Sequence, residues 1–249
     1  MSEKSAFGAP VTFKIGGRSY DGIYGESLLE ALRRYGYEVP SLCHHEAVTS
    51  YGACRMCLVE VVDKRGRHKL STSCNYPVQA GIDVLLDTPD VVKHRKVVLE
   101  LLLAMAPDSP ELRELAAEHG VSGGRLEGER TEHECILCGL CERVCREVVG
   151  ANAISMTARG AVKHMGTPYE EANEACIACG ACVWVCPTKC IGLEEQDGQR
   201  TIVRWKRTLP LAVCEQTGRQ FTPQYLLEYY SKRLGGLDPK VFKKAPPYR

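Results

Sequence analysis

The feature that most constrains this chain is a cysteine pattern that occurs twice, 41 residues apart. Both copies have the spacing C-x2-C-x2-C-x3-C, and Pro187 directly follows the second copy. In chain order the cysteines are Cys135, Cys138, Cys141, Cys145, Cys176, Cys179, Cys182 and Cys186. Three thiolates at such short spacing can hold one iron–sulfur cube, whereas the fourth, three residues further along, is directed away from it.

The fourth cysteine of each copy is expected to link the two halves of the repeat. In two-cluster ferredoxins this cysteine ligates the cluster of the other copy. We therefore expect one 4Fe–4S cluster on Cys135, Cys138, Cys141 and Cys186, and a second on Cys176, Cys179, Cys182 and Cys145. Zinc is the alternative, because C-x2-C also occurs in zinc knuckles. Zinc sites, however, usually take two separated cysteine pairs and not three evenly spaced cysteines.

A second cysteine constellation, C-x10-C-x2-C-x16-C, lies nearer the N-terminus and comprises Cys43, Cys54, Cys57 and Cys74. Four sulfurs in a small sheet domain, with the middle pair in a loop, favour an all-cysteine 2Fe–2S cluster. Gly52 and Ala53 precede the middle pair, and such small residues let the backbone come close to a cluster. A structural zinc ion on the same four thiolates is the alternative.

The cysteine content favours a reducing compartment. Fourteen cysteines in 249 residues would indicate disulfides in a secreted protein. The first residues show no basic-then-apolar signal, and the longest apolar run, residues 97–106, contains Glu100 and is too short to cross a bilayer. We therefore expect a cytoplasmic protein with no direct membrane insertion. The 32 basic residues balance 31 acidic ones, which disfavours a nucleic-acid partner.

Local patterns predict four segments and an α+β fold class. The first, residues 1–86, is expected to be a β-grasp 2Fe–2S ferredoxin-like domain. Residues 87–130 are expected to form a helical connector, and residues 131–195 a double 4Fe–4S ferredoxin-like domain. Residues 196–249 are expected to form a C-terminal docking extension.

Several individual elements can be predicted from turn, cap and periodicity signals. Gly16-Gly17 predicts a hairpin between strands at residues 11–15 and 18–23. Apolar runs predict further strands at residues 58–62 and 201–205. Helices are expected at residues 27–35, 91–105 and 111–119, and after Thr222-Pro223.

The sequence around the cysteines resembles a known family. Residues 41–44 and 51–61 are similar to the N-terminal part of the complex I 75 kDa subunit, and even more to the small diaphorase subunit of NAD-reducing soluble hydrogenases. Residues 134–145 resemble the same family, and the likeness covers roughly residues 10–195 in the same module order. The resemblance implies an electron conduit between a flavoprotein that handles NAD(H) and a second redox subunit.

One position departs from that family. The family usually has a 4Fe–4S site with one histidine and three cysteine ligands between the first module and the repeat. Here no cysteine lies between Cys74 and Cys135, and Ala106 and Ser109 stand where the family has the histidine and the first cysteine. His119 is interpreted as a helix-end residue. We therefore predict three clusters, one 2Fe–2S and two 4Fe–4S.

Four further residues are given structural interpretations. Cys190 is expected to pack beside a cluster as a small apolar residue would. Cys214 resembles the remnant of a zinc-ribbon knuckle, and no metal is predicted there. His44 and His45 adjoin Cys43 and are expected to surround the site without ligating it.

The chain contains no Ser-His-Asp set, paired acid motif or phosphate-binding glycine loop, so we expect electron transfer and no substrate turnover by this chain itself. The resemblance implies a soluble multisubunit NAD(P)-linked hydrogenase, including the electron-bifurcating type. Its partners would be a flavin- and NAD(P)-binding subunit and either the hydrogenase small and large subunits or another redox subunit. The alternatives are the electron conduit of an NAD-dependent formate dehydrogenase and, in a different class, a zinc-stabilised interaction module without redox function.

Overall fold

The computed structural model describes residues 7–123, 126, 134–235 and 243–245. The chain forms two compact units, Met1–Cys138 and Gly139–Arg249. The boundary between them falls inside the first copy of the cysteine repeat, so that Cys135 and Cys138 belong to one unit and Cys141 and Cys145 to the other.

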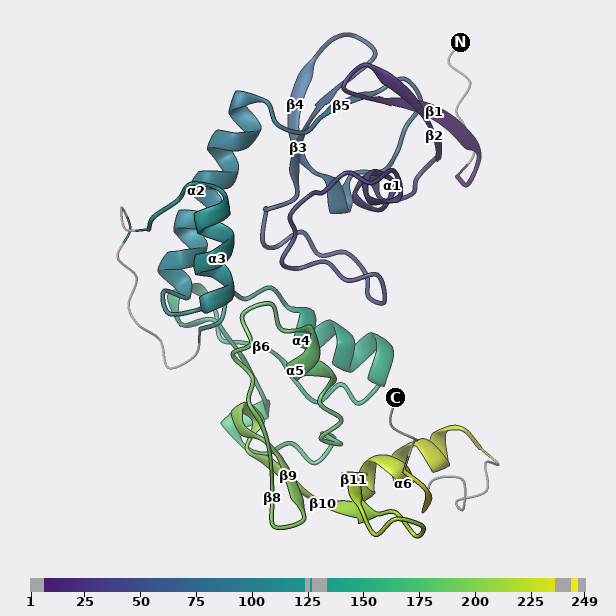
Figure 1. Ribbon diagram of the computed structural model, residues 1–249, viewed down its shortest axis with the longest axis vertical. Coiled ribbons are helices and arrows are strands. Elements are labelled where there is room, and N and C mark those ends of the chain that lie inside the picture. The colour runs from purple at the N-terminus through teal and green to yellow at the C-terminus, as the bar shows by residue number, and fades with distance from the viewer. Residues whose placement is uncertain (1–6, 124–125, 127–133, 236–242, 246–249) are drawn as a thin grey trace. The chain divides into compact units, whose positions relative to one another are not determined.

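The first unit begins with a five-stranded sheet and one helix that packs on it (Figure 1). The strand order is β2-β1-β5-β3-β4; β1 and β5 are parallel and the other neighbours antiparallel. This is the order of a β-grasp fold, and it confirms the predicted α+β class. The elements are β1 (Pro10–Ile15), β2 (Arg18–Ile23), α1 (Leu28–Arg34), β3 (Leu58–Val62), β4 (His68–Thr72) and β5 (Asp83–Leu85).

The residue pattern explains how this sheet forms. Alternate residues of β1 are buried, as a strand with one face on a core requires: Val11, Phe13 and Ile15. Gly16 and Gly17 adopt φ of +56° and +82°, which glycine reaches without strain, and the predicted hairpin is confirmed. The buried face of α1 completes the core through Leu28, Leu29 and Leu32.

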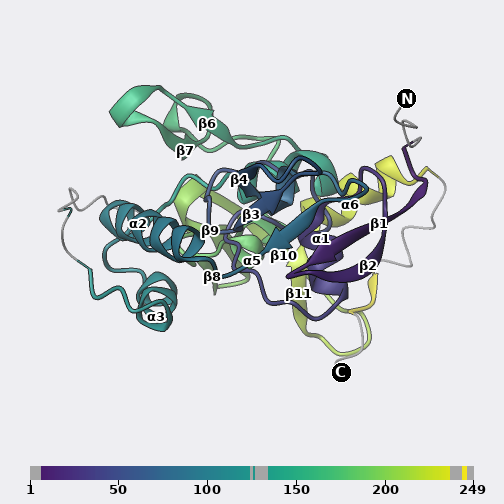
Figure 2. The ribbon, with the colours of Figure 1, turned by 90° about the horizontal axis from the view of Figure 1, so that it is seen from above.

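Two helices follow the sheet within the first unit, α2 (Pro89–Met105) and α3 (Pro110–Glu118). Each begins with a capping side chain and a proline in its first turn: Thr88 Oγ1 accepts from Val91 N at 3.4 Å, and Ser109 Oγ accepts from Leu112 N at 3.4 Å. The two helices lie side by side (Figures 1 and 2). The helices expected at residues 91–105 and 111–119 are therefore present, while residues 124–125 and 127–130 of the predicted connector lie outside the described residues.

A buried arginine fastens α2 to the sheet. Arg95 is 5% exposed, and its guanidinium donates to Leu58 O at 2.7 Å and to Asp87 Oδ1 at 3.2 Å. Burial lowers the pKa of Arg95, although the neighbouring Asp87 carboxylate counteracts this. Since Leu58 directly follows Cys57, the contact joins the helix to the end of a cysteine-bearing loop.

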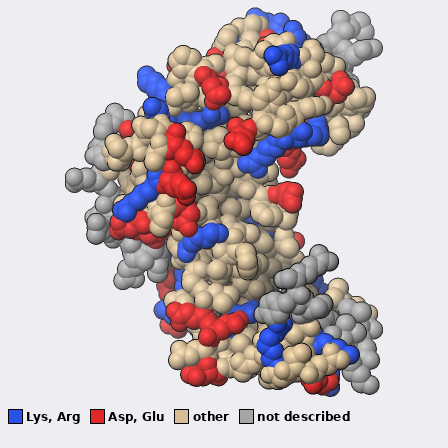
Figure 3. All heavy atoms as spheres, in the orientation of Figure 1, with Lys and Arg blue, Asp and Glu red and all other residues tan. Residues whose placement is uncertain are grey.

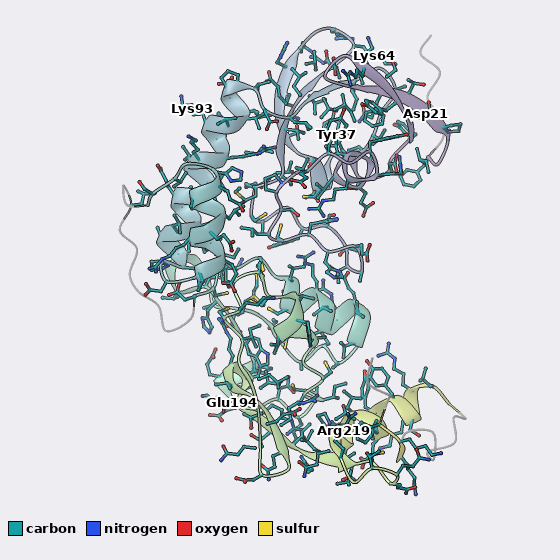
Figure 4. The ribbon with its side chains drawn as sticks, viewed as in Figure 1. Asp21, Tyr37, Lys64, Lys93, Glu194 and Arg219 are labelled. Atoms are coloured by element: carbon teal, nitrogen blue, oxygen red, sulfur yellow. The ribbon has the colours of Figure 1, made fainter. Side chains whose placement is uncertain are left out.

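Replacing Arg95 by methionine keeps the apolar stem but removes both hydrogen bonds. We expect the free energy of opening of this region to fall by about 1–3 kcal/mol, because the Leu58 carbonyl loses its charged donor. Hydrogen exchange of β3 in the full chain measures the change. Lys93→Met is the matched control, since Lys93 is on the same helix, is exposed and points away from the sheet (Figure 4). Equal exchange in the two variants would contradict the prediction.

The second unit contains short helices, a two-stranded ribbon and a four-stranded sheet of order β11-β10-β9-β8. The ribbon of β6 and β7 lies apart from that sheet (Figure 2). The elements are α4 (Leu140–Arg143), a π-helical turn (Val144–Val149), β6 (Ser155–Thr157), β7 (His164–Gly166), α5 (Ala181–Val185), β8 (Leu193–Gln196), β9 (Gln199–Ile202), β10 (Arg207–Val213), β11 (Gln220–Pro223) and α6 (Gln224–Arg233).

The strand predicted at residues 201–205 is only partly correct. β9 ends at Ile202, and Val203–Trp205 forms a 3-10 turn. Lys206 adopts a left-handed conformation (φ +51°) and reverses the chain into β10. β8, β10 and β11 are strands that the sequence pattern does not predict.

Candidate iron–sulfur sites

The four N-terminal cysteines lie in loops of the first unit. Cys43 follows α1, Cys54 and Cys57 lie in the loop before β3, and Cys74 lies in a 3-10 turn (Ser73–Asn75) after β4. All four residues are only 1–3% exposed, so their sulfurs are shielded from solvent. Gly52, in the same loop, has φ +73° and lies directly against the Asn75 side chain, which leaves no space for a Cβ atom.

These cysteines are brought together in two contacting pairs. The Cys54 N–H donates to Cys43 Sγ at 3.4 Å, and the Cys74 thiol is hydrogen-bonded to Cys57. The contact between Cys57 and Cys74 lowers the pKa of Cys57 to about 6 and raises the pKa of Cys74. The pKa of Cys54 is raised by the hydrogen bond between Cys54 and Cys43 and by burial. Two thiols of the set thus keep their protons in the absence of metal, and a bound metal would displace them.

The repeat gives both of its copies the same local backbone. A left-handed glycine begins a short helix in each: Gly139 (φ +69°) before α4 and Gly180 (φ +81°) before α5. The residue two positions earlier is also left-handed, Leu137 at φ +52° and Ala178 at φ +49°. Non-glycine residues rarely adopt this conformation, so both loops hold a strained backbone of the kind found at binding sites.

A cavity in the second unit has four cysteines in its wall: Cys145, Cys176, Cys179 and Cys182. Apolar side chains form much of the remaining wall, among them Val149, Ile154, Ile177, Ile202 and Trp205. The structure thus places the last cysteine of the first copy with the first three cysteines of the second copy. Cys186, the last cysteine of the second copy, is not among the lining residues.

Nitrogen donors reach the sulfurs and backbone of this cavity. Ala153 N donates to Cys145 Sγ at 3.3 Å, and Trp205 Nε1 donates to Cys182 Sγ at 3.3 Å. The cavity loop is also held from β10, where Arg207 Nε donates to Cys176 O at 3.0 Å. Sequence reasoning missed Trp205 and Arg207, because nothing in their local pattern marks them as partners of the cysteines.

The chemistry of the cavity fits an iron–sulfur cluster. Burial raises the pKa of the Cys176 and Cys179 thiols, and it raises the pKa of Cys182 to about 12 although the Trp205 indole opposes the shift. The raised pKa values mean that these buried thiols stay protonated unless a bound cation stabilises the thiolates. Four cysteine thiolates are the ligand set of a 4Fe–4S cluster, and N–H donors to the sulfurs and low solvent exposure help to set its reduction potential.

The other predicted set, Cys135, Cys138, Cys141 and Cys186, draws residues from both units, and its assignment depends on the sequence. Within the second unit, Cys186 is 6% exposed and its Sγ lies 3.6 Å from Cys190 Sγ. That contact lowers the pKa of Cys186 to about 5. Arg204 Nη1 in turn donates to Cys190 Sγ at 3.2 Å. Cys190 therefore has polar contacts in addition to the packing role predicted for it.

Two histidines beside Cys43 have partners away from it. His44 Nδ1 lies 3.2 Å from Ser50 Oγ and its Nε2 lies 3.9 Å from Glu30 Oε1. His45 Nδ1 accepts from Ala47 N at 3.1 Å. That both histidines surround the site without ligating it stays a prediction.

The corner between α2 and α3 is built for packing and capping. Ala106 is fully buried (0% exposed), and Ser109, 1% exposed, is the α3 cap described above. Asp108 N donates to Glu134 Oε2 at 2.9 Å, which ties this corner to the residue before Cys135. His119 stands at the C-terminal end of α3, as predicted.

Cys214 lies in a tight loop after β10, where Cys214 N donates to Arg219 O at 2.8 Å. The Thr217 hydroxyl lowers the pKa of Cys214 to about 6. All fourteen cysteines are described, and none of them forms a disulfide. Among the described residues, no three His, Cys, Asp or Glu side chains are arranged to hold a single metal ion.

The surface carries charges of both signs. On the face shown in Figure 3, lysine and arginine are interspersed with aspartate and glutamate, in agreement with the net charge of +1. Of the described helices, none has both the length and the apolar character needed to span a bilayer.

Comparison with protein families assigns a domain to each cysteine region. Residues 8–89 match a 2Fe–2S iron–sulfur cluster binding domain, and residues 134–190 match a 4Fe–4S dicluster domain. The two matches have the order that the sequence predicts, and they leave the residues after 190 unmatched.

Whole-chain comparisons find relatives in several redox enzymes. The chain is 31% identical to a subunit of an NADH-quinone oxidoreductase from Rhizobium meliloti (66% of this chain, 22% of the relative) and 30% identical to the NADP-reducing hydrogenase subunit HndD of Solidesulfovibrio fructosivorans (72% and 35%). It is 31% identical to the mitochondrial NADH-ubiquinone oxidoreductase 78 kDa subunit of Neurospora crassa (72% and 27%). The chain therefore spans 22–35% of the length of these relatives.

A solved structure shows the same likeness. A chain of an NAD+-reducing NiFe hydrogenase in the H2-reduced state superposes with a TM-score of 0.56 at 27% identity, covering 64% of this chain and 75% of that one. The matched domains, their order and these relatives together show that this chain carries a 2Fe–2S domain and a 4Fe–4S dicluster domain homologous to parts of NADH-quinone oxidoreductase and NAD(P)-linked hydrogenase subunits.

Proposed function

We propose that this chain is an iron–sulfur electron-transfer subunit of a multisubunit NAD(P)-linked hydrogenase. It would pass electrons between a flavin- and NAD(P)-binding subunit and the hydrogenase subunits, working in the reducing cytoplasm. The partners follow from the names of the relatives, which include an NADP-reducing hydrogenase subunit and an NAD+-reducing hydrogenase.

The observation that carries the proposal is the four-cysteine cavity of the second unit. Cys145 lies in its wall with Cys176, Cys179 and Cys182, and backbone and indole N–H groups donate to two of these sulfurs. A 4Fe–4S cluster bound there would accept and release single electrons. The chain's own contribution is to provide the thiolates, to exclude water with apolar side chains and to stabilise negative charge through the N–H donors.

The proposal assigns three clusters. One 4Fe–4S cluster belongs to the cavity set, and the other to Cys135, Cys138, Cys141 and Cys186. The 2Fe–2S cluster belongs to Cys43, Cys54, Cys57 and Cys74, whose burial and mutual contacts support a shared ligand role. No fourth cluster is assigned, because the corner at Ala106 and Ser109 offers no thiolate.

Iron and sulfide analysis of the anaerobically purified chain tests this assignment. We expect about ten irons and about ten acid-labile sulfides per chain, which is the content of one 2Fe–2S and two 4Fe–4S clusters. After dithionite reduction, electron paramagnetic resonance should show signals of more than one cluster. Zinc in place of iron, with no signal after reduction, would contradict the redox function and favour the interaction module. About fourteen irons would contradict the three-cluster count.

A further inference from the structure

Two consecutive side chains of the Val203–Trp205 turn reach two different cysteine sets of the repeat. Trp205 is 2% exposed, and its indole N–H donates to Cys182 Sγ at 3.3 Å, in the cavity set. Arg204 points to the other set, since its Nη1 donates to Cys190 Sγ at 3.2 Å and Cys190 Sγ lies 3.6 Å from Cys186 Sγ. The guanidinium also lies over the Trp205 ring, 5.4 Å from its centroid, so each side chain holds the other in place.

The direction of the hydrogen bonds in the Arg204 chain follows from ligation. A Cys186 sulfur bound to iron carries no proton, so Cys190 must be the donor in the contact between them. Arg204 donates to the Cys190 sulfur and polarises its thiol, which strengthens the hydrogen bond to Cys186. Arg204 Nη2 also donates to Met165 O at 3.4 Å, which fixes the guanidinium in this position.

Both contacts favour the reduced form of a cluster. Reduction adds one negative charge, which spreads over the sulfurs, so a nearby N–H dipole or guanidinium charge stabilises the reduced state more than the oxidised state. Hydrogen bonds to the sulfurs are among the known determinants of cluster potential. An indole buried in an apolar wall has a large effect for one hydrogen bond, because little solvent screens it.

We propose that Trp205 and Arg204 are positioning residues that set the reduction potentials of the two 4Fe–4S clusters separately. Trp205 raises the potential of the cavity cluster through Cys182, and Arg204 raises that of the other cluster through Cys190 and Cys186. The inference rests on the proposed function. Since the turn lies beyond the matched dicluster domain, which ends at residue 190, the C-terminal segment gains a redox role beyond docking.

Trp205→Phe keeps an aromatic ring and removes the indole N–H. In a redox titration of the full cluster-loaded chain followed by electron paramagnetic resonance, the cavity cluster should become harder to reduce. At the wild-type midpoint we expect its reduced-to-oxidised ratio to fall about tenfold, equivalent to about 59 mV for a one-electron couple. The signal of the other 4Fe–4S cluster should keep its midpoint. Trp184→Phe is the matched control, because Trp184 lies in α5 between two cluster cysteines but is 82% exposed.

Arg204→Gln removes the charge and should give the complementary result. The midpoint potential of the 4Fe–4S cluster assigned to Cys135, Cys138, Cys141 and Cys186 should become more negative. The midpoint potential of the cavity cluster should shift less. Cys190→Ala breaks the same chain, so Arg204→Gln should add little in a Cys190→Ala background. Full additivity of the two changes would contradict the relay through Cys190.

Three results would overturn the inference: unchanged midpoints in Trp205→Phe and Arg204→Gln with iron content intact, equal shifts of both clusters in each variant, or the same shift in Trp184→Phe. If Trp205→Phe fails to hold its cluster, benzothienylalanine at position 205 preserves the shape and lacks only the N–H. Its midpoint then decides the question. Absence of iron from the wild-type chain would instead contradict the proposed function.

Discussion

Replacing Cys145 by alanine should remove the cluster of Cys176, Cys179 and Cys182, and leave intact the cluster whose cysteines are nearest to Cys145 in sequence. The reason is the cavity, whose wall contains Cys145 together with those three cysteines. Alanine has no atom that can bind iron, so a cluster with three remaining ligands is lost or degraded. About four of about ten irons per chain should disappear, together with one of the two 4Fe–4S resonance signals.

A set of single variants shows which cluster is lost. Cys145→Ala and Cys179→Ala should remove the same resonance signal, and Cys186→Ala and Cys138→Ala should remove the other. Each pair of variants contains one cysteine from each copy of the repeat. If each copy instead bound its own cluster, Cys145→Ala would remove the same signal as Cys138→Ala. Loss of the same signal in Cys145→Ala and Cys138→Ala would show that each copy binds its own cluster, and the assignment would be wrong.

Removal of iron should unfold the cysteine repeat while the N-terminal sheet stays folded. The sheet has a continuous core that includes Phe13, Leu29 and Val59, none of which is a ligand. In the second unit the short helices α4 and α5 each contain a cysteine of the repeat, and the cavity beside α5 has four cysteines in its wall. We therefore expect metal binding to contribute a much larger share of the folding free energy of the second unit than of the N-terminal sheet.

Hydrogen exchange before and after iron chelation measures this difference. We expect the amides of α4 and α5 to exchange more than about a hundredfold faster without iron, a loss of at least about 2.7 kcal/mol of local stability. The amides of β1 and β3 should change little. The loop of Cys54 and Cys57 serves as an internal reference, because it should lose protection together with its own cluster. Equal loss in β1 and α4 would show that the two units unfold together.

The sequence predicts best what depends on neighbouring residues. Gly16-Gly17 gives the hairpin because two left-handed positions in succession are accessible to glycine. Thr88 and Ser109, each followed by proline, predict the starts of two helices because the caps act within one turn. The spacing of the cysteines is also a local signal, and it predicts the domains that the family comparison identifies, while the assignment of each cysteine to a cluster stays a prediction.

The C-terminal sheet is harder to predict, although one signal for it is present. Asp197 and Gly198 are both left-handed (φ +51° and +75°) and join β8 to β9, which is the pattern of a two-residue hairpin turn. Pro210 in β10 argues against a central strand. The structure resolves this conflict: β10 pairs with β9 up to Pro210 and with β11 from Leu211 onward, so the proline lies where the strand changes partners.

The side chains that donate to cysteine sulfurs in the second unit could not be predicted from the sequence. Trp205 is 23 residues from Cys182, and Arg204 is 14 residues from Cys190. Their contacts exist because the β8–β9 hairpin and the following turn bring the chain back to the cysteine loops. Such hydrogen bonds depend on tertiary structure and have no local sequence signature.

The packing of the corner formed by Ala106 and Ser109 limits which substitutions it can accept. A histidine at position 106 would overfill a fully buried site, at a cost of about 1–3 kcal/mol. A cysteine at position 109 would give up the cap of α3, for roughly another 1 kcal/mol. Neither change would yield a metal centre alone, because the further thiolates are also missing. Each of these single substitutions is thus destabilising before any metal could bind, so the corner disfavours the stepwise acquisition of a histidine-and-cysteine ligand set.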